Sequence, residues 1–176
     1  MLYYTGIGSR ETPREFCKIF ARCARYLQKQ GIVLRSGAAE GADEAFESGA
    51  GKLKEIYLPW KNFNENRSKL VLEDMENKDE AIELAKKFHP NWNSLTNGAK
   101  SLQARNSYQV FGKDLNTPSM FVVCWTKKGF GVGGTGQALR IARENNIPVF
   151  DAGVFDDAEE MEDALKIFIK NNLKIN

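Results

Sequence analysis

The sequence predicts an α/β protein, a doubly wound parallel sheet, from a chain of 176 residues. Short apolar runs alternate with amphipathic segments of helical length, a pattern typical of parallel sheets covered by helices. Two of the runs, 32–34 and 120–125, are followed by the glycine-rich turns 35–43 and 131–137. In this fold class such turns meet at the carboxyl edge of the sheet, where helix N-termini and free backbone N–H groups favour anions. We therefore expect a site for a phosphate-bearing ligand at that edge.

The first elements are predicted from periodicity and from punctuating residues. Residues 2–7 form an apolar strand that ends in the turn Gly6-Ile7-Gly8-Ser9-Arg10. A helix is predicted to begin at Thr12-Pro13, a capping-box pattern with proline at the first helical position, and to end at Gly31. Its apolar side chains recur at helical spacing. The elements expected next are the strand 32–34, a helix over 40–50 and a strand over 55–59.

The alternation is interrupted between residues 60 and 93, which we interpret as an insertion or lid at the sheet edge, with one helix in its charged segment 73–87. The elements expected after it are the helix 94–111, the strand 120–125, the helix 135–144, the strand 147–150 and the helix 156–172. The last helix has acidic residues in its first turns and lysines later, which suits the helix dipole. No repeat or linker divides the chain, so we expect one domain over residues 1–176.

Composition excludes several classes of protein. With 42% hydrophobic residues the chain is not disordered, and no apolar run approaches the roughly 20 residues of a transmembrane helix. The start of the sequence lacks a charged region followed by an apolar core, so we expect no signal peptide. A net charge of +2 neither requires nor excludes a nucleic-acid partner.

The cysteines and the single histidine predict neither a metal nor a redox site. Cys17, Cys23 and Cys124 have apolar surroundings and no metal-like spacing, so we expect reduced thiols and a cytoplasmic location. His89 has no Ser or Cys partner at hand and is expected to be structural. We therefore expect no cofactor, no metal and no association with membranes.

The first and last glycine turns are the leading candidates for phosphate binding. In the first, Gly8 and Ser9 provide backbone N–H groups, and Arg10 provides a guanidinium that binds phosphate through two hydrogen bonds. A tight strand–helix connection is the structural alternative. The last turn contains Gly133, Gly134, Thr135 and Gly136. Three glycines at a helix start are entropically costly, and close approach of a ligand to the backbone explains them best.

The middle turn allows two interpretations. Its small residues Ser36, Gly37 and Gly41 let a helix pack closely on the sheet, or they contact the ligand. Its acidic residues Glu40 and Asp43 brace the turn, or they contact sugar hydroxyls or a base edge, as a ribose-binding acid does. The sequence leaves both interpretations open.

Aromatic and basic residues beside the turns are further candidates. Trp125 and Phe130 flank the last turn, where they stack on a base or close the core. Arg105 and Asn106 lie on a predicted helix and reach either the pocket or the surface. The pair Lys127-Lys128 is a solvated loop unless a single strand of nucleic acid passes nearby.

Three segments resemble the SLOG superfamily of Rossmann-like nucleotide-binding domains, in its DprA/Smf-like branch. Gly6-Ile7-Gly8-Ser9-Arg10 resembles the family's first-strand turn, and segment 35–43 resembles its Ser-Gly-x-Ala-x-Gly-x-Asp turn. Ala104-Arg105-Asn106 is similar to its Arg-Asn helix. The resemblance spans residues 2–151 and is closer still to small single-domain DprA-like proteins of bacteriophages. It implies a Rossmann-like fold, nucleotide binding, a role in DNA processing and a homo-oligomer.

The chain departs from the related LOG branch, which cleaves the N-glycosidic bond of nucleoside monophosphates with a Pro-Gly-Gly-x-Gly-Thr-x-x-Glu motif. Here Val132 replaces the proline, Gln137 the threonine and Arg140 the catalytic glutamate. Such an enzyme needs a carboxylate, which in this chain has to come from Glu40 or Asp43.

Three functions follow, in this order. The first is a protein that binds a nucleotide or nucleotide-derived signal and senses or sequesters it. The alternative is a nucleotide N-glycosidase, a phosphoribohydrolase-like hydrolase that uses one of the two carboxylates. The second alternative is a DprA-like single-stranded DNA-binding protein, with Arg10, Arg35, Arg105 and the lysine pair on the DNA backbone.

Overall fold

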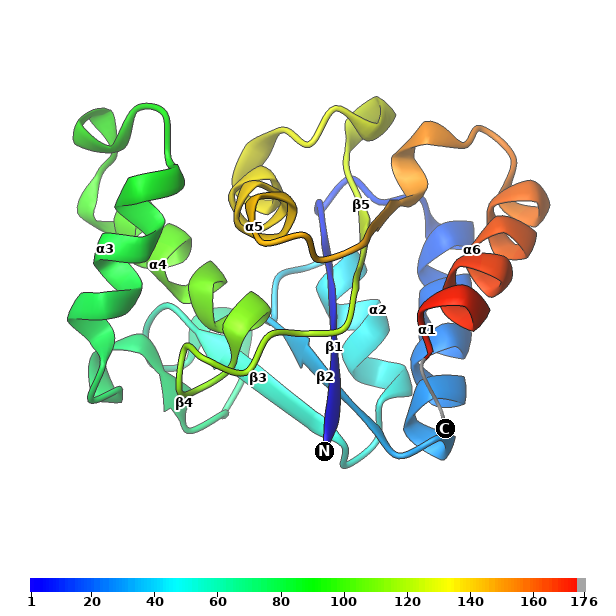
Figure 1. Cartoon of the computed structure of the whole chain (residues 1–176), viewed down its shortest axis with the longest axis horizontal. Helices are drawn as coiled ribbons and strands as arrows, with labels where there is room; N and C mark the ends of the chain where they lie inside the picture. The colour runs from blue at the N-terminus through cyan, green and yellow to red at the C-terminus, as the bar shows by residue number, and fades with distance from the viewer. Residues whose placement is uncertain (174–176) are drawn as a thin grey trace.

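Six parallel strands form one sheet in the computed structural model, which describes residues 1–173 (Figure 1). The strands are β1 (Leu2–Gly8), β2 (Ile32–Ser36), β3 (Lys54–Leu58), β4 (Leu70–Val71), β5 (Val122–Trp125) and β6 (Val149–Asp151). Their order in the sheet is β4-β3-β2-β1-β5-β6. The first strand is central, and its Thr5 lies opposite Arg35 of β2 and Val122 of β5. The Rossmann-like α/β fold predicted from the sequence is confirmed.

Helices cover both faces of this sheet. They are α1 (Arg14–Lys29), α2 (Ala42–Gly49), α3 (Lys78–Phe88), α4 (Asn97–Phe111), α5 (Gly133–Glu144) and α6 (Ala158–Asn172). One layer contains α1, α2 and α6, and the other contains α3, α4 and α5 (Figure 1). Within residues 1–173, no helix combines the length and the apolar character needed to cross a lipid bilayer.

Alternation along β1 distributes its side chains between the two layers. Tyr4 belongs to the core under α1, α2 and α6, whereas Ile7 belongs to the core under α5. The ring of Phe46 on α2 stacks on Phe20 with 4.5 Å between the ring centroids. A Cβ at Gly6 would lie 2.6 Å from the Phe46 ring. Gly6 therefore lets α2 pack directly on the central strand, which positions the turn in front of α2.

Five helix starts differ from the sequence-based expectation, among them α4, which begins at Asn97 and not at residue 94, and α5, which begins at Gly133 and not at residue 135. The predicted capping box at Thr12 is wrong, because α1 begins at Arg14 behind Pro13 without a side-chain cap. The Thr12 hydroxyl instead donates to the Ser9 carbonyl, 2.6 Å away. Helix α2 begins only at Ala42, since Gly41 has φ +83°. Helix α6 begins at Ala158, where the Asp157 side chain accepts from the backbone of the first turn.

The segment 60–93 adds an edge to the fold. Its two-residue strand β4, which the sequence analysis did not predict, pairs in parallel with β3, so that Leu70 lies opposite Tyr57. Its helix α3 buries Ala81 and Ala85 in a small core shared with Tyr108 of α4. Sheet and helical layer are therefore both extended by this segment.

Candidate functional site

A cavity of about 410 Å³ opens at the carboxyl edge of the central strands. Nine of the residues singled out from the sequence line it, namely Gly8, Ser9, Arg10, Asp43, Arg105, Asn106, Gly133, Gly134 and Thr135. They come from the turn after β1, the start of α2, the middle of α4 and the start of α5. The cavity thus lies where the predicted phosphate site was expected, between segments that are far apart in the sequence.

Strand order explains why these segments meet. Because β1 lies between β2 and β5 and all three run parallel, the turns that follow them emerge side by side. Gly8 is opposite Trp125 in the register, and the Ser9 N–H donates to the Trp125 carbonyl at 3.0 Å. The loop before α5 therefore begins directly beside the turn of β1.

The Asp43 carboxylate holds the first two turns together. One oxygen accepts from the Gly8 N–H at 2.9 Å, and the other accepts from the N–H groups of Gly37 at 3.1 Å and Ala39 at 3.4 Å. Burial raises the pKa of this carboxyl to about 6, against the lowering effects of the Arg105 charge and of the three N–H donors. Asp43 acts here as a brace for the backbone of the cavity.

Arg105 provides a buried positive charge. Its Nη1 donates to the carbonyl of Gly37 and, at 2.9 Å, to that of Tyr57, while its Nε donates to Asn106 Oδ1 at 3.1 Å. Its Nη2 has no hydrogen-bond partner among residues 1–173, although the residue lines the cavity and is only 5% exposed. Burial lowers the Arg105 pKa to about 10, with Asp43 acting in the opposite direction, so the side chain is cationic at neutral pH.

The N-terminus of α5 faces the same cavity. No side chain caps this helix of 12 residues, whose N-cap is Val132. The Asn106 side chain donates to the Gly134 carbonyl at 2.9 Å and so joins α4 to the start of α5. A Cβ at Gly133 or Gly134 would meet nothing within 4 Å, which leaves the backbone there open to an approaching group. Free N–H groups and the helix dipole favour anions at a helix N-terminus of this kind.

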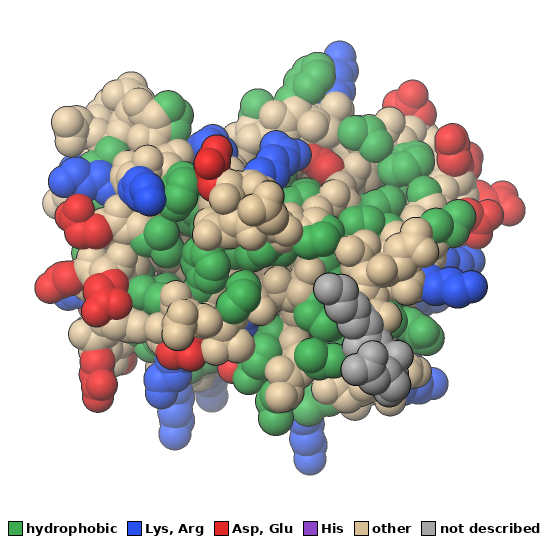
Figure 2. Space-filling view, in the orientation of Figure 1, with side chains coloured by type: hydrophobic (Ala, Val, Ile, Leu, Met, Phe, Trp, Pro, Cys, Tyr) green, Lys and Arg blue, Asp and Glu red, His purple; other side chains and the backbone are tan. Residues whose placement is uncertain are grey.

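Arg10 and Ser9 form part of the rim. The Ser9 hydroxyl accepts from the Glu11 N–H at 3.1 Å, and Arg10 is exposed. Glu11 also lines the cavity and lies 3.9 Å from Lys127 across exposed surface. On the face shown in Figure 2, basic and acidic side chains are interspersed and do not gather into one positive surface.

Three small residues of the middle turn serve packing. Ser36 donates its hydroxyl hydrogen to the Gly6 carbonyl at 2.6 Å and is fully buried. A Cβ at Gly37 would overlap the Arg105 and Gln109 side chains, and one at Gly41 would lie 2.6 Å from the Ser9 carbonyl. The structure thus favours the packing interpretation for these positions.

Three other candidates lie outside the cavity lining. Glu40 is exposed, Trp125 places its indole in the core under α1 and α6, and Gly136 packs against the Gly131 carbonyl. Trp125 contributes to the site through its backbone alone, by the bond from Ser9. Phe130, two residues before Val132 of the cavity lining, is 71% exposed, and Trp60, 39% exposed, packs against Phe63 of the lining.

Eight cavity residues were not among the candidates from the sequence: Ile7, Glu11, Ala39, Phe63, Leu102, Gln103, Gln109 and Val132. Leu102, Arg105 and Gln109 are three and four residues apart on α4, so they share one face of that helix. This spacing was visible in the sequence and, with Arg105 already a candidate, would have indicated Gln109.

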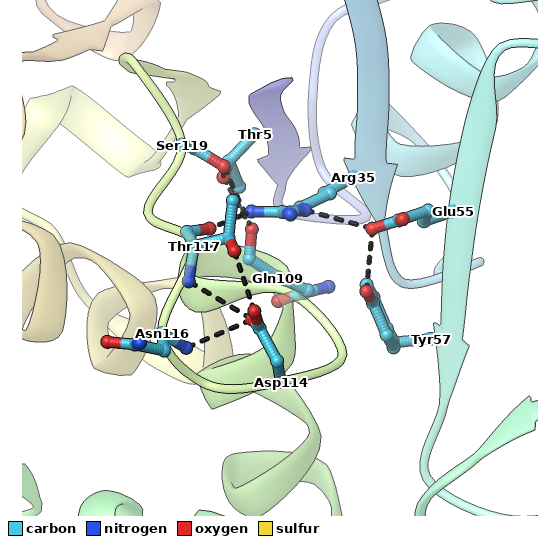
Figure 3. Close-up of polar contacts among 9 residues, drawn as sticks. All are labelled: Thr5, Arg35, Glu55, Tyr57, Gln109, Asp114, Asn116, Thr117 and Ser119. Carbon is cyan, nitrogen blue, oxygen red and sulfur yellow. Dashed lines mark hydrogen bonds and ion pairs between the residues drawn. The ribbon is translucent and has the colours of Figure 1, made fainter. Parts of the chain in front are cut away.

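A second cavity, of about 530 Å³, lies on the α4 side of β1, β2 and β3 and contains Arg35. Arg35 donates to Glu55 at 2.9 Å and to the Thr117 carbonyl (Figure 3), and its guanidinium stacks 3.8 Å from the centroid of the Tyr3 ring. Tyr57 donates to the same Glu55 at 2.7 Å. With 2% exposure Arg35 is a structural ion pair, which corrects its assignment to the DNA backbone.

Within residues 1–173, no three His, Cys, Asp or Glu side chains are grouped so as to hold a metal ion. His89 lies outside the cavity lining, where its Nδ1 accepts from the Asn91 N–H at 3.2 Å. The chemistry of the candidate site is therefore that of backbone N–H groups, two arginines and carboxamides.

Comparison with known proteins supports the fold. No protein-family model matches the chain, and no curated protein matches it significantly in sequence. A solved structure of DNA processing protein A from Helicobacter pylori, described for its unique mode of binding single-stranded DNA, is similar to it with a TM-score of 0.54 and 22% identity. The match covers 85% of this chain and 64% of that one, so the chain spans less than two thirds of that protein.

Proposed function

We propose that this chain binds single-stranded DNA and seats one nucleotide of the strand in the cavity between β1, α4 and α5. One observation carries the proposal: the uncapped N-terminus of α5 and the buried Arg105, whose Nη2 has no hydrogen-bond partner among residues 1–173, line the same cavity. Both bind phosphate oxygens well, and the exposed Arg10 adds a second guanidinium at the rim. The similarity to a DNA processing protein that binds single-stranded DNA supports the same choice.

The loop beside the cavity has the side chains that a single strand requires. Phe130 is largely exposed, and Lys127 and Lys128 lie next to it with exposed side chains. Single-stranded nucleic acids bind to positively charged grooves with aromatic rings on which bases stack. A strand that enters the cavity with one phosphate therefore meets an aromatic ring and two cations on leaving it.

Binding of a free nucleotide is the second candidate. The cavity volume of about 410 Å³ lies within the usual range for small-molecule sites, and the mixed charges of the surface favour a ligand held inside the cavity. The glycosidase hypothesis gains less support. Glu40 is outside the cavity lining, and both oxygens of Asp43 accept hydrogen bonds from the backbone.

Fluorescence anisotropy with a labelled 12-nucleotide strand tests the proposal. If two to three phosphates are neutralised, the logarithm of the binding constant should fall with the logarithm of salt concentration with a slope of about −1.5 to −2. Arg10→Ala should weaken binding severalfold and reduce that slope by about 0.7. Arg25→Ala, which removes an exposed arginine of α1 outside the cavity lining, is the matched control and should change neither.

Competition and product analysis separate the candidates. If a deoxynucleoside monophosphate binds and the strand does not, nucleotide binding would replace DNA binding as the proposed function. Release of free base during incubation would restore the glycosidase hypothesis. If Arg10→Ala and Arg25→Ala changed the affinity for the strand equally, the cavity would not be part of the DNA-binding surface.

A further inference from the structure

The side chain of Gln109 lies in the wall of the cavity, and its carboxamide has no hydrogen-bond partner within the described part of the chain. The residue is 2% exposed and lines the cavity, and its carboxamide makes no hydrogen bond with any of residues 1–173. Its backbone carbonyl, in contrast, accepts from the hydroxyls of Thr5 and Ser119, which fixes the residue on α4 (Figure 3). A donor and an acceptor that line a cavity without a protein partner are free to bind a ligand.

A second carboxamide shows the same property. The Oε1 atom of Gln103 is buried, has no partner, and belongs to a residue that lines the same cavity. Between these two glutamines on α4 lies Arg105 with its free Nη2. Ile7 and Phe63 add apolar surface to the lining. This wall is suited to a planar, polar-edged group, whereas the glycine turns are suited to a phosphate.

Strand order separates these two parts of the cavity by the length of a nucleotide. Gln109 Nε2 lies against Gly37, which follows β2, whereas the N-terminus of α5 follows β5. The strand between them is β1. Neighbouring strands are about 4.8 Å apart, so the two parts are on the order of 10 Å apart. A nucleotide whose phosphate lies at α5 therefore extends its base towards Gln109.

We propose that Gln109 recognises the edge of an adenine base in this cavity and makes the site selective for adenine. A glutamine carboxamide offers one donor and one acceptor in a plane, which matches adenine N7 and N6 through two hydrogen bonds. This inference rests on the proposed function, because the base reaches the cavity as part of the bound strand. The phosphate contacts hold any strand, and the carboxamide distinguishes the base.

Binding of labelled dA12, dT12 and dC12 strands at one salt concentration tests the inference. The wild-type protein should prefer dA12, by about 5- to 150-fold if both hydrogen bonds form. Gln109→Leu, which keeps the size of the side chain, should abolish the preference by lowering the affinity for dA12 to that of the variant for dT12. Urea unfolding of the variant verifies that it is folded.

A strand of 7-deazaadenine nucleotides tests the contact to adenine N7 separately. It lacks the N7 acceptor but keeps the N6 donor, so it should bind to the wild-type protein more weakly than dA12, while Gln109→Leu should not distinguish it from dA12. Binding of all strands with equal affinity by both proteins would overturn base recognition and leave DNA binding standing. An adenine preference that persists in Gln109→Leu would assign the recognition to another residue. Failure of every strand to bind would overturn the proposed function itself.

Discussion

Arg105 donates a hydrogen bond from its buried guanidinium to the carbonyl of Gly37, and so connects the middle of α4 to the turn after β2. The Gln109 side chain lies against the same glycine. Because Gly37 has no Cβ, the side chains of Arg105 and Gln109 both pack directly against its backbone. Gly37 therefore contributes to the site by leaving space for the Arg105 and Gln109 side chains.

Gly37→Ala is expected to disturb both neighbours. The added methyl group would overlap Arg105 Nη1 and Gln109 Nε2, which are held in a close-packed region. Overpacking of this kind costs typically about 1–3 kcal/mol in the free energy of unfolding, and binding of DNA should weaken with it. Urea denaturation and anisotropy measure the two effects.

Gly134→Ala is the contrasting substitution at the same cavity. A Cβ there would meet nothing within 4 Å, and the residue lies in the first turn of α5. Because alanine favours helix more than glycine does, the free energy of unfolding should be unchanged or rise by up to about 1 kcal/mol. Destabilisation of both variants to the same extent would contradict this assignment of the two glycines.

Replacement of Arg35 should separate stability from DNA binding. Arg35→Met leaves Glu55 without its ion pair and the Thr117 carbonyl without a donor. Loss of one partner of a buried pair costs about 3–5 kcal/mol, and the lower end is expected because Glu55 is 26% exposed. The affinity of the folded protein for single-stranded DNA should not change, since Arg35 is outside the candidate site. If Arg35→Met reduced the affinity for single-stranded DNA without changing the free energy of unfolding, Arg35 would belong to the binding surface.

The raised pKa of Asp43 predicts an unusual dependence of stability on pH. The folded carboxyl has a pKa of about 6, above the roughly 3.9 of an unfolded aspartate. Between these values the folded state binds more protons, so the contribution of Asp43 to stability falls as pH rises from 4 to 6. The stability difference between the wild-type protein and Asp43→Asn should therefore shrink over this range, by at most about 3 kcal/mol.

Asp114→Asn is the control for this experiment. Hydrogen bonds from Thr117 and the backbone lower the pKa of the Asp114 carboxyl, so its titration lies below that of the unfolded chain. Its contribution should be constant from pH 4.5 to 7 and be lost only in stronger acid. A difference for Asp43→Asn that grows with pH would mean that the anion is stabilised by folding.

Self-association remains a prediction from the sequence resemblance. Tyr26 on α1 and Ile167 on α6 are large apolar side chains exposed on the layer away from the cavity-lining helix α4. Size-exclusion chromatography with light scattering, at protein concentrations spanning two orders of magnitude, should show a dimer or larger species. A monomeric mass at every concentration would contradict the prediction.

The sequence indicated the site in outline but not the roles of its residues. Glycine turns after apolar runs are local signals, and Gly8, Gly133 and Gly134 do line one cavity. The two strand β4 residues were missed because so short a strand has no periodicity of its own. The capping box at Thr12 failed because Pro13 and not Thr12 is the N-cap of α1, and the Thr12 hydroxyl donates to the Ser9 carbonyl, a contact that depends on the path of the turn.

The sequence by itself determined the class of fold, since alternating strands and helices leave a parallel sheet as the arrangement that buries both kinds of apolar face. It also determined that glycine turns meet at one edge. Contacts between distant elements determine that Arg35 pairs with Glu55, that Arg105 lines the cavity, and that the Gln109 carboxamide has no partner within residues 1–173. Whether a side chain is compensated or free depends on neighbours from distant strands and helices, which local patterns do not specify.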